Sequence, residues 1–296
     1  MKENFVVSII TPFYKGNKYL NQLFSVININ YANLKLKYPQ SDIELLIIND
    51  SPDTPVNTWE LKNSFNYRII NHEQNSGIHQ ARVTGLKHCI GDYIIFFDQD
   101  DVLEDNALVS QIDSLIHNNA DMVVCNAMME EDDGSHYICY KSKTDFNRIN
   151  DLQFYLKSHN VIKSPGQCLI KKGIIPAEWK KYIMTKNGSD DLFLWILLLE
   201  KSYRFYINRE VLYIHKYTGE NLSETEEKMN LSSLEIVEYL NNISYVPSRD
   251  TIQLKRAREF SSELSHSNSL KKLLVCIKYI DLFWYLAINK VKKIIY

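Results

Sequence analysis

The chain has 296 residues, 45% of them hydrophobic and 24% charged, and its formal net charge is −2 at pH 7. These values are typical of a globular protein, and they exclude collagen-like and disordered chains. The balanced charge, with no basic residues interleaved with aromatic ones, argues against nucleic acid as a partner.

Five cysteines, widely spaced and odd in number, lack the paired spacing of a zinc or redox motif. They predict reduced thiols in a cytoplasmic protein. Residues 1–4 lead directly into an apolar stretch without the hydrophobic leader of a signal peptide, so export is not expected.

The first half of the chain alternates short apolar runs with longer helical stretches. Strands are predicted at 5–10, 44–48, 67–70, 93–97 and 121–127, and helices at about 18–37, 77–88 and 103–117. Nearly continuous apolar strands separated by helices are typical of a mainly parallel sheet that is covered on both faces. The sequence therefore predicts a doubly wound α/β fold that binds ligands at the carboxyl edge of its strands.

Three carboxylates follow the fourth predicted strand within four residues, at Asp98, Asp100 and Asp101. Carboxylates this close repel one another, so at least one would take up a proton unless a cation or a strong donor lay among them. Oxygen ligands at the end of a buried strand suit Mg²⁺ or Mn²⁺ that holds a diphosphate. The alternative is an exposed acidic turn in which Asp98 or Asp101 caps the next helix.

Four motifs in register resemble the amino-terminal half of family 2 glycosyltransferases of the GT-A fold. They are VSIITPFY at 7–14, IINDS at 47–51, NSG at 75–77 with Arg82, and GDY at 91–93 before the DxDD of 98–101. The likeness is strong over about the first 105 residues and fades towards residue 223. The second motif departs from the family, which usually has two acidic residues where this chain has Asn49 and Asp50.

The resemblance implies a metal-dependent, inverting glycosyltransferase. Its donor would be a nucleotide diphosphate-sugar, with UDP-sugar favoured, and its acceptor a hydroxyl of a glycan. By analogy with relatives of this size, the acceptor is a lipid-linked intermediate of a bacterial surface polysaccharide. The cofactor expected is Mn²⁺ or Mg²⁺, with Asp100 as its ligand and Asp98 in contact with the metal or the ribose.

Further donor contacts are expected near the ends of the first strands. Asp50 is positioned to accept from the ring N–H of uracil or thymine, with the backbone around Thr11, Pro12 and Tyr14 lining the base. An alternative role for Asp50 is a turn-forming residue before Pro52. From the resemblance alone, Gly77 and Arg82 belong to the donor site, and Arg82 reaches the base or the phosphates.

Two acids, Asp190 and Asp191, precede an apolar helix in the second half and resemble the Glu-Asp pair of the family. Inverting transfer needs a carboxylate that takes the proton of the acceptor hydroxyl, and Asp191 is the residue expected to do so. The alternative is structural: Ser189 caps this helix, and both acids stabilise its first turn through the helix dipole.

A strand ending at His215 precedes a polar loop with Asn221-Leu222-Ser223. The family often carries a histidine here, in a loop that closes over the donor. The resemblance thus implies that His215 is a third metal ligand or a diphosphate contact, although a lone histidine is more often structural.

The predicted domains are a catalytic domain at 1–223, with a nucleotide-binding half at 1–105 and an acceptor half at 106–223, and a helical extension at 224–296. Helices are expected at about 224–242, 248–266 and 269–295. The segment 268–296 has six lysines and one acid, a local charge of +5, with apolar side chains opposite the lysines.

A basic amphipathic helix of this kind suits an anionic membrane surface, which would make the protein peripheral on the inner face of the cell membrane. Its apolar run is too short for a span. Docking of the segment on the catalytic domain, or on a second subunit of a homo-oligomer, is the alternative.

Two other functions are compatible with these patterns. One is a non-catalytic nucleotide-sugar-binding scaffold in a membrane-associated assembly complex. The other is a sugar-phosphate nucleotidyltransferase, but such enzymes normally carry a glycine-rich basic loop after the first strand, which residues 11–16 do not supply.

Overall fold

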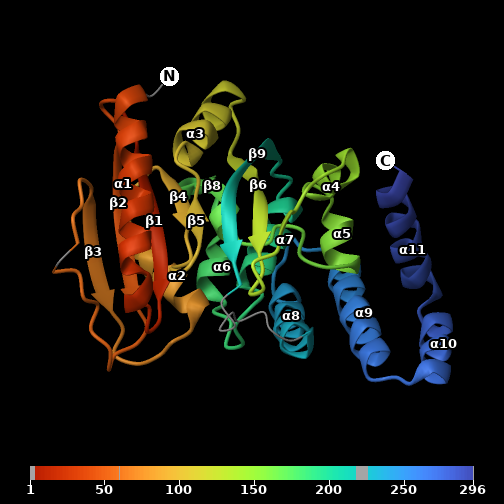
Figure 1. Cartoon of the computed structure of the whole chain (residues 1–296). Helices are drawn as coiled ribbons and strands as arrows, with labels where there is room; N and C mark the ends of the chain where they lie inside the picture. The colour runs from red at the N-terminus through yellow and green to blue at the C-terminus, as the bar shows by residue number, and fades with distance from the viewer. Residues whose placement is uncertain (1–3, 60, 218–225, 296) are drawn as a thin grey trace. The chain divides into compact units, whose positions relative to one another are not determined.

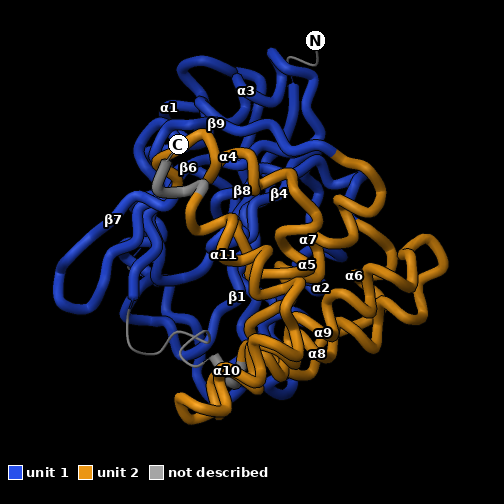
Figure 2. Tube along the Cα trace, turned by 90° about the vertical axis from the view of Figure 1, so that its right-hand side faces the viewer, with its two compact units in different colours: residues 1–139, 162–175, 204–221 blue, residues 140–161, 176–203, 222–296 orange. Residues whose placement is uncertain are grey.

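The computed structural model describes residues 4–59, 61–217 and 226–295 (Figure 1). These residues form two compact units that interleave along the chain, coloured separately in Figure 2. Unit 1 comprises residues 1–139, 162–175 and 204–221, and unit 2 comprises residues 140–161, 176–203 and 222–296. The domain boundary predicted at residue 223 lies outside the described residues.

Unit 1 is built on a mixed sheet. Its strands are β1 (Val6–Phe13), β2 (Asp42–Asn49), β3 (Asn66–Asn71), β4 (Tyr93–Phe96), β5 (Val102–Leu103), β6 (Met122–Glu130), β7 (His136–Ile138), β8 (Cys168–Lys171) and β9 (Phe205–Lys216). The strand order is β3-β2-β1-β4-β8-β6-β9-β5, and β7 pairs with β6. The five predicted strands are confirmed as β1, β2, β3, β4 and β6.

The sheet runs mainly in one direction. β3, β2, β1 and β4 are parallel to one another, and β6 is parallel to β9. The short strand β8 is antiparallel to both β4 and β6, so these two strands point the same way on either side of it. The antiparallel strand β8 therefore joins two groups of parallel strands, β3-β2-β1-β4 and β6-β9, into one sheet.

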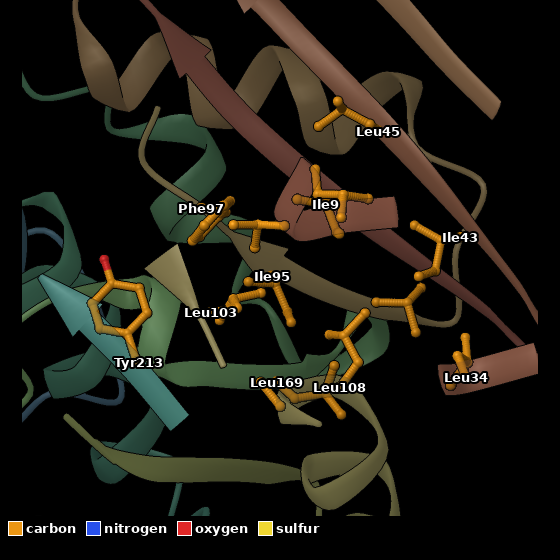
Figure 3. Close-up of a cluster of buried hydrophobic side chains, with 14 of the residues drawn as sticks. Ile9, Leu34, Ile43, Leu45, Ile95, Phe97, Leu103, Leu108, Leu169 and Tyr213 are labelled. Atoms are coloured by element: carbon orange, nitrogen blue, oxygen red, sulfur yellow. The ribbon is translucent and has the colours of Figure 1, made fainter. Parts of the chain in front are cut away.

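Helices cover both faces of this sheet. Alternate side chains of the strands, including Ile9, Ile43 and Ile95, pack with side chains of α1 (Leu20–Lys37) and α3 (Ala107–His117) in one buried cluster (Figure 3). The opposite face of β1 contacts α2 (Ile78–His88), where a Cβ added at Gly85 would lie 2.2 Å from Ile10. Because both faces are buried, β1, β2 and β4 are mostly apolar, and the predicted doubly wound α/β fold is confirmed.

Short 3-10 helices complete unit 1 at Asn17–Tyr19, Pro165–Gln167 and Lys172–Ile174. α1 also supports α3 directly, because the buried Asn30 side chain accepts from the Leu108 backbone N–H near the start of α3. A helix begins with N–H groups that have no partner within the helix, so this contact satisfies one of them.

Unit 2 is helical. Its helices are α4 (Lys143–Arg148), α5 (Leu152–Lys157), α6 (Ala177–Lys181), α7 (Asp190–Glu200), α8 (Glu226–Leu240), α9 (Ser248–Ser265), α10 (Ser269–Lys278) and α11 (Ile280–Ile295). α7 is apolar on all sides after its first two residues and is almost entirely buried. It packs against α5, α6 and α8. Because α7 is covered on several sides, its apolar residues do not follow the period of a helix with one exposed face.

The single helix predicted at 269–295 is interrupted. Tyr279 has φ −114° and ψ 44°, outside the helical region, and separates α10 from α11. Its ring is buried against Phe260 of α9, and its hydroxyl donates to Glu263 at 2.9 Å. The Tyr279 side chain is thus packed on α9 at the point where the helix breaks. The periodicity of the sequence does not show this break. None of the helices within 4–59, 61–217 and 226–295 has the length and apolar content of a membrane span.

Candidate functional site

The carboxyl ends of the parallel strands bring the predicted donor residues of unit 1 to one edge of the sheet. β1 ends at Phe13 opposite Asn49 of β2, and the Phe97 N–H bonds to the Ile10 carbonyl. Thr11 and Pro12 belong to β1 itself, and the Tyr14 ring just beyond it is 48% exposed. Parallel strands that end together place their following loops side by side, as predicted.

Gln99 connects the loop after β4 to the loop after β1 by hydrogen bonds. The Tyr14 N–H donates to Gln99 Oε1 at 3.0 Å, and Gln99 Nε2 donates to the Tyr14 carbonyl at 3.2 Å. A Cβ on Gly16 would lie 2.1 Å from Gln99 Oε1, so only glycine permits this approach. Sequence reasoning missed Gln99, because it stands at the unspecified position of the acidic motif.

Asp98 is paired with Arg82. Arg82 Nη2, on a side chain that is only 4% exposed, donates to Asp98 Oδ1 at 2.8 Å, and the Ser164 hydroxyl donates to Asp98 Oδ2 at 3.4 Å. Burial raises the pKa of Asp98, while the Arg82 guanidinium lowers it. Arg82 is therefore a buried partner of the acidic motif and not a solvated charge on the helix surface.

Asp101 is fully buried and joins the acidic loop to β9. The Tyr213 hydroxyl and the Lys216 N–H donate to it, the latter at 2.9 Å, and His215 Nδ1 lies 3.0 Å from Asp101 Oδ1. The Ser164 hydroxyl lies 2.6 Å from the Tyr213 hydroxyl. Asp101 does not cap the following helix, whose N-cap is Asn106, and its contacts are structural instead. Tyr213 and Ser164, which were not among the predicted site residues, belong to the same network.

His215 lies close to Asp101 and among the carboxylates of the acidic loop. Burial lowers its pKa, but the carboxylates of Asp101, Asp98 and Asp100 outweigh this and raise the pKa to about 9. A protonated imidazole cannot coordinate a metal until it loses a proton. The resemblance implied a metal ligand or a diphosphate contact for His215, and both roles stay predictions.

Burial and neighbouring carboxylates raise the pKa of Asp100, as they raise that of Asp98. Burial is the largest cause, and together with the charges of Asp101 and Asp98 it raises the pKa of Asp100 to about 7. In the part of the chain that the structure describes, no three His, Cys, Asp or Glu side chains are arranged to hold a metal ion by themselves. Mg²⁺ sites need no such triad, because one or two carboxylates and substrate phosphates suffice. The oxygen ligands of Asp100 and Asp98 fit this kind of site.

Asp50 holds the loop that starts α2. Its Oδ1 accepts from the Ser76 N–H and lies 2.8 Å from His72 Nδ1, and its Oδ2 accepts from the Gly77 N–H at 2.8 Å. The Asp50 side chain is therefore bound to the start of α2 and does not form the turn before Pro52, which was its alternative role. A carboxylate has about four lone-pair positions, and the three contacts above use three of them. One position remains for the predicted contact to the base. Gly77 has φ 86°, a left-handed conformation that favours glycine.

Asp191 lies in the first turn of α7 in unit 2 and is 8% exposed. Its Oδ2 accepts from Asn160 Nδ2 at 2.6 Å, and its Oδ1 accepts from the Leu192 N–H at 2.7 Å. Ser189 is at the N-cap position but makes no side-chain capping bond, so the predicted cap is absent while the two acids do occupy the first turn. Asn160, thirty-one residues earlier, is a partner that sequence reasoning missed.

We predict that Gly166→Ala disturbs the network around Asp101. A Cβ at this position would lie 2.3 Å from Cε2 of the buried Tyr213 ring, so the ring must move and its hydroxyl with it. Overpacking of this kind costs about 1–3 kcal/mol of unfolding free energy. Chemical denaturation measures the loss, and Gly173→Ala, where nothing lies within 4 Å of the added Cβ, is the matched control. Equal stability of the two variants would contradict the packing described for Tyr213.

The model of the family described as glycosyl transferase family 2 matches residues 8–176, more than half of the chain. The chain belongs to this family. The resemblance seen in the sequence motifs is thereby confirmed. The family 2 chain spans about a third to a half of the length of the curated relatives it matches.

One of these relatives is the UDP-Glc:alpha-D-GlcNAc-diphosphoundecaprenol beta-1,3-glucosyltransferase WfgD of Escherichia coli. It is 31% identical over 127 residues, which are 42% of this chain and 46% of WfgD.

Two solved structures share the fold of the family 2 chain. The Staphylococcus aureus TarS fragment 1–349 in complex with UDP-GlcNAc has a TM-score of 0.60 at 17% identity, with 94% of this chain and 81% of that chain covered. The mannosyltransferase PcManGT of Pyrobaculum calidifontis, in complex with GDP-Man and Mn²⁺, has a TM-score of 0.57 at 14% identity, with coverage of 98% and 87%. At these identities the likeness concerns the fold alone, which is GT-A.

Proposed function

We propose that this family 2 chain is a metal-dependent, inverting glycosyltransferase of polysaccharide biosynthesis. It transfers a sugar from a nucleotide diphosphate-sugar, with UDP-sugar favoured, to a hydroxyl of a glycan or lipid-linked glycan. The observation that carries the proposal is the acidic cluster at the carboxyl edge of the sheet, where burial and like charges raise the pKa of Asp100 to about 7. Such a cluster is suited to a divalent cation with a diphosphate.

The names of similar proteins support this donor and acceptor. WfgD acts with UDP-Glc on a diphosphoundecaprenol-linked sugar, and TarS binds UDP-GlcNAc. A Mn²⁺ ion accompanies GDP-Man in the mannosyltransferase of the same fold. A uridine nucleotide, a lipid-linked acceptor and Mn²⁺ or Mg²⁺ are therefore the first choices for this chain.

In the proposed donor site, Asp100 and Asp98 hold the cation, which when bound neutralises charge on the leaving nucleoside diphosphate. His215 supplies a further positive charge to the diphosphate. Arg82 acts through its ion pair with Asp98, and Gly77 begins the helix that carries Arg82. Asp50, with Thr11, Pro12 and Tyr14, forms the proposed contact region for the base.

In the proposed acceptor step, Asp191 takes the proton from the acceptor hydroxyl as its oxygen attacks the anomeric carbon. The new glycosidic bond forms while the bond from the anomeric carbon to the phosphate oxygen breaks, so the nucleoside diphosphate leaves with the electron pair. Asn160 orients the Asp191 carboxylate through its 2.6 Å hydrogen bond. Attack opposite the leaving group inverts the anomeric centre.

A donor screen tests the proposal. The cognate UDP-sugar or UDP should stabilise the protein in thermal-shift assays with Mn²⁺ or Mg²⁺, by about 2.7 kcal/mol at 100 times its Kd. Release of UDP in the presence of glycan and lipid-linked acceptors then measures transfer. Donor binding without turnover on any acceptor would instead support the non-catalytic scaffold, and no response to any nucleotide sugar would overturn both. We further propose that the enzyme works in the cytoplasm.

A further inference from the structure

α10 and α11 carry two apolar stripes, and only one of them is covered. Val275, Tyr279 and Leu282 are buried and pack on Ala257 and Phe260 of α9. Figure 1 shows α10 and α11 running back alongside α9 in the opposite direction. The segment thus packs on α9, which is another helix of the predicted extension at 224–296.

The second stripe is exposed. On α10 it consists of Leu270, Leu273, Leu274 and Ile277, and on α11 of Ile280, Trp284, Ile288 and Val291, each between 48% and 79% exposed. Their spacing is i, i+3, i+4 and i+7 on α10 and i, i+4, i+8 and i+11 on α11, as on one face of a helix. At about 100° per residue, Ile277 is about 200° away from the buried Val275, which puts this stripe on the face turned away from α9.

The concentration of exposed apolar side chains here is unusual within the chain. With Phe283, this segment supplies nine of the twenty large hydrophobic residues that are exposed among the described residues. Exposed apolar side chains gathered on one side of a helix are typical of an interaction site. The stripe is therefore a docking surface. The charge of the helices that carry it indicates what kind of partner binds there.

The charge next to the stripe is positive and is not cancelled locally. The one acid of the segment, Asp281, is bound by Arg256 of α9 through two contacts at 2.9 and 3.0 Å. Lys278 pairs with Glu263, also of α9, whereas Lys271, Lys272 and Lys290 are exposed and have no ion pair recorded within the described residues. A partner with negative charge at the edges of an apolar surface would complement this pattern.

We propose that the exposed stripe of α10 and α11, with the lysines of the same helices, binds the surface of an anionic lipid bilayer. The helices would lie in the plane of the interface, with the apolar side chains among the acyl chains and the lysines at the headgroups. Trp284 suits that depth, because tryptophan prefers the membrane interface. A second copy of the chain fits less well, because its lysines would repel and lysine is depleted in protein interfaces. This surface does not depend on the proposed transferase activity.

Vesicle cosedimentation with the full chain tests the proposal. Vesicles containing phosphatidylglycerol should bind the protein at least about tenfold more tightly than vesicles of phosphatidylcholine alone, and added salt should weaken the binding. Reversal of three lysines, Lys271→Glu with Lys272→Glu and Lys290→Glu, should reduce binding roughly 100-fold. The same number of reversals at the exposed Lys62, Lys87 and Lys180 is the matched control and should reduce it far less.

Apolar variants test the stripe itself. Trp284→Ser should weaken vesicle binding roughly tenfold, whereas Trp59→Ser, at a tryptophan that is 82% exposed in a loop, should not. Ile277→Ser and Ile252→Ser form a second pair, because these isoleucines are 58% and 57% exposed. Circular dichroism and thermal melts check that each variant is folded.

Three results of the vesicle assays would overturn the proposal. They are failure to bind phosphatidylglycerol vesicles, equal binding to neutral and anionic vesicles, and equal losses in the stripe and control variants. A dimer seen by light scattering without lipid, and abolished by Ile277→Ser, would instead identify a second copy of the chain as the occupant and would also overturn it.

Discussion

Asp191→Asn is expected to lower kcat by about 10²–10⁴-fold, the usual contribution of a general base, and to leave donor binding intact. Asparagine has the same shape but cannot take the proton of the acceptor hydroxyl. The hydrogen bonds that position this side chain, from Asn160 and the Leu192 N–H, are known from the structure, and Asn160→Ala should lower kcat by a smaller factor. UDP release with saturating donor and acceptor measures kcat, and the thermal shift caused by UDP measures donor binding.

Asp190→Asn is the matched control for this prediction. Asp190 and Asp191 are neighbours, both are buried, and both contribute a negative charge to the first turn of α7. Each substitution therefore removes a similar helix-dipole interaction, about 0.3–1 kcal/mol. If the two variants lost activity equally, or if Asp191→Asn lost only stability, the role of Asp191 would be structural.

Removal of the divalent cation is expected to abolish turnover and most of the stabilisation by UDP, and Asp100→Asn should do the same with the cation present. Without a neutralising ion, burial and the charges of Asp101 and Asp98 raise the pKa of Asp100 to about 7. Protons and Mn²⁺ then compete for one carboxylate, so cation affinity should fall about tenfold per pH unit below pH 7 and level off above it. Thermal shifts by Mn²⁺ with UDP at pH 6, 7 and 8 measure this dependence.

The cation-free protein should show the opposite trend in stability. The pKa of Asp100 is raised from 3.8 to about 7 on folding, so the folded chain holds this proton more tightly than the unfolded chain does. The contribution of Asp100 to stability is therefore greatest below pH 3.8 and is lost as the pH rises towards 7. Asp100→Asn should remove this contribution, whereas Asp132→Asn, at an exposed acid in the loop between β6 and β7, should not. A cation response that persists in Asp100→Asn would exclude Asp100 as the main ligand.

The sequence predicted where the candidate donor residues lie in the fold, although their role stays a prediction. Thr11, Asp50 and Asp98 each stand at or just beyond the end of a parallel strand, and parallel strands bring such positions to one edge. Their hydrogen-bond partners were not predictable. Asp50 holds the start of α2 and Arg82 neutralises Asp98, contacts that depend on how the following helix packs on the sheet.

The sequence alone determined the five apolar strands, the helices between them and the class of fold, because alternation, apolar runs and turn residues act among near neighbours in the chain. Only the tertiary structure decided the insertion of β8 between β4 and β6, the break at Tyr279 and the network from Asp101 to Tyr213 and His215. These features join residues as many as 114 positions apart. They arise from burial, register and hydrogen bonding between packed elements, which no local pattern of residues encodes.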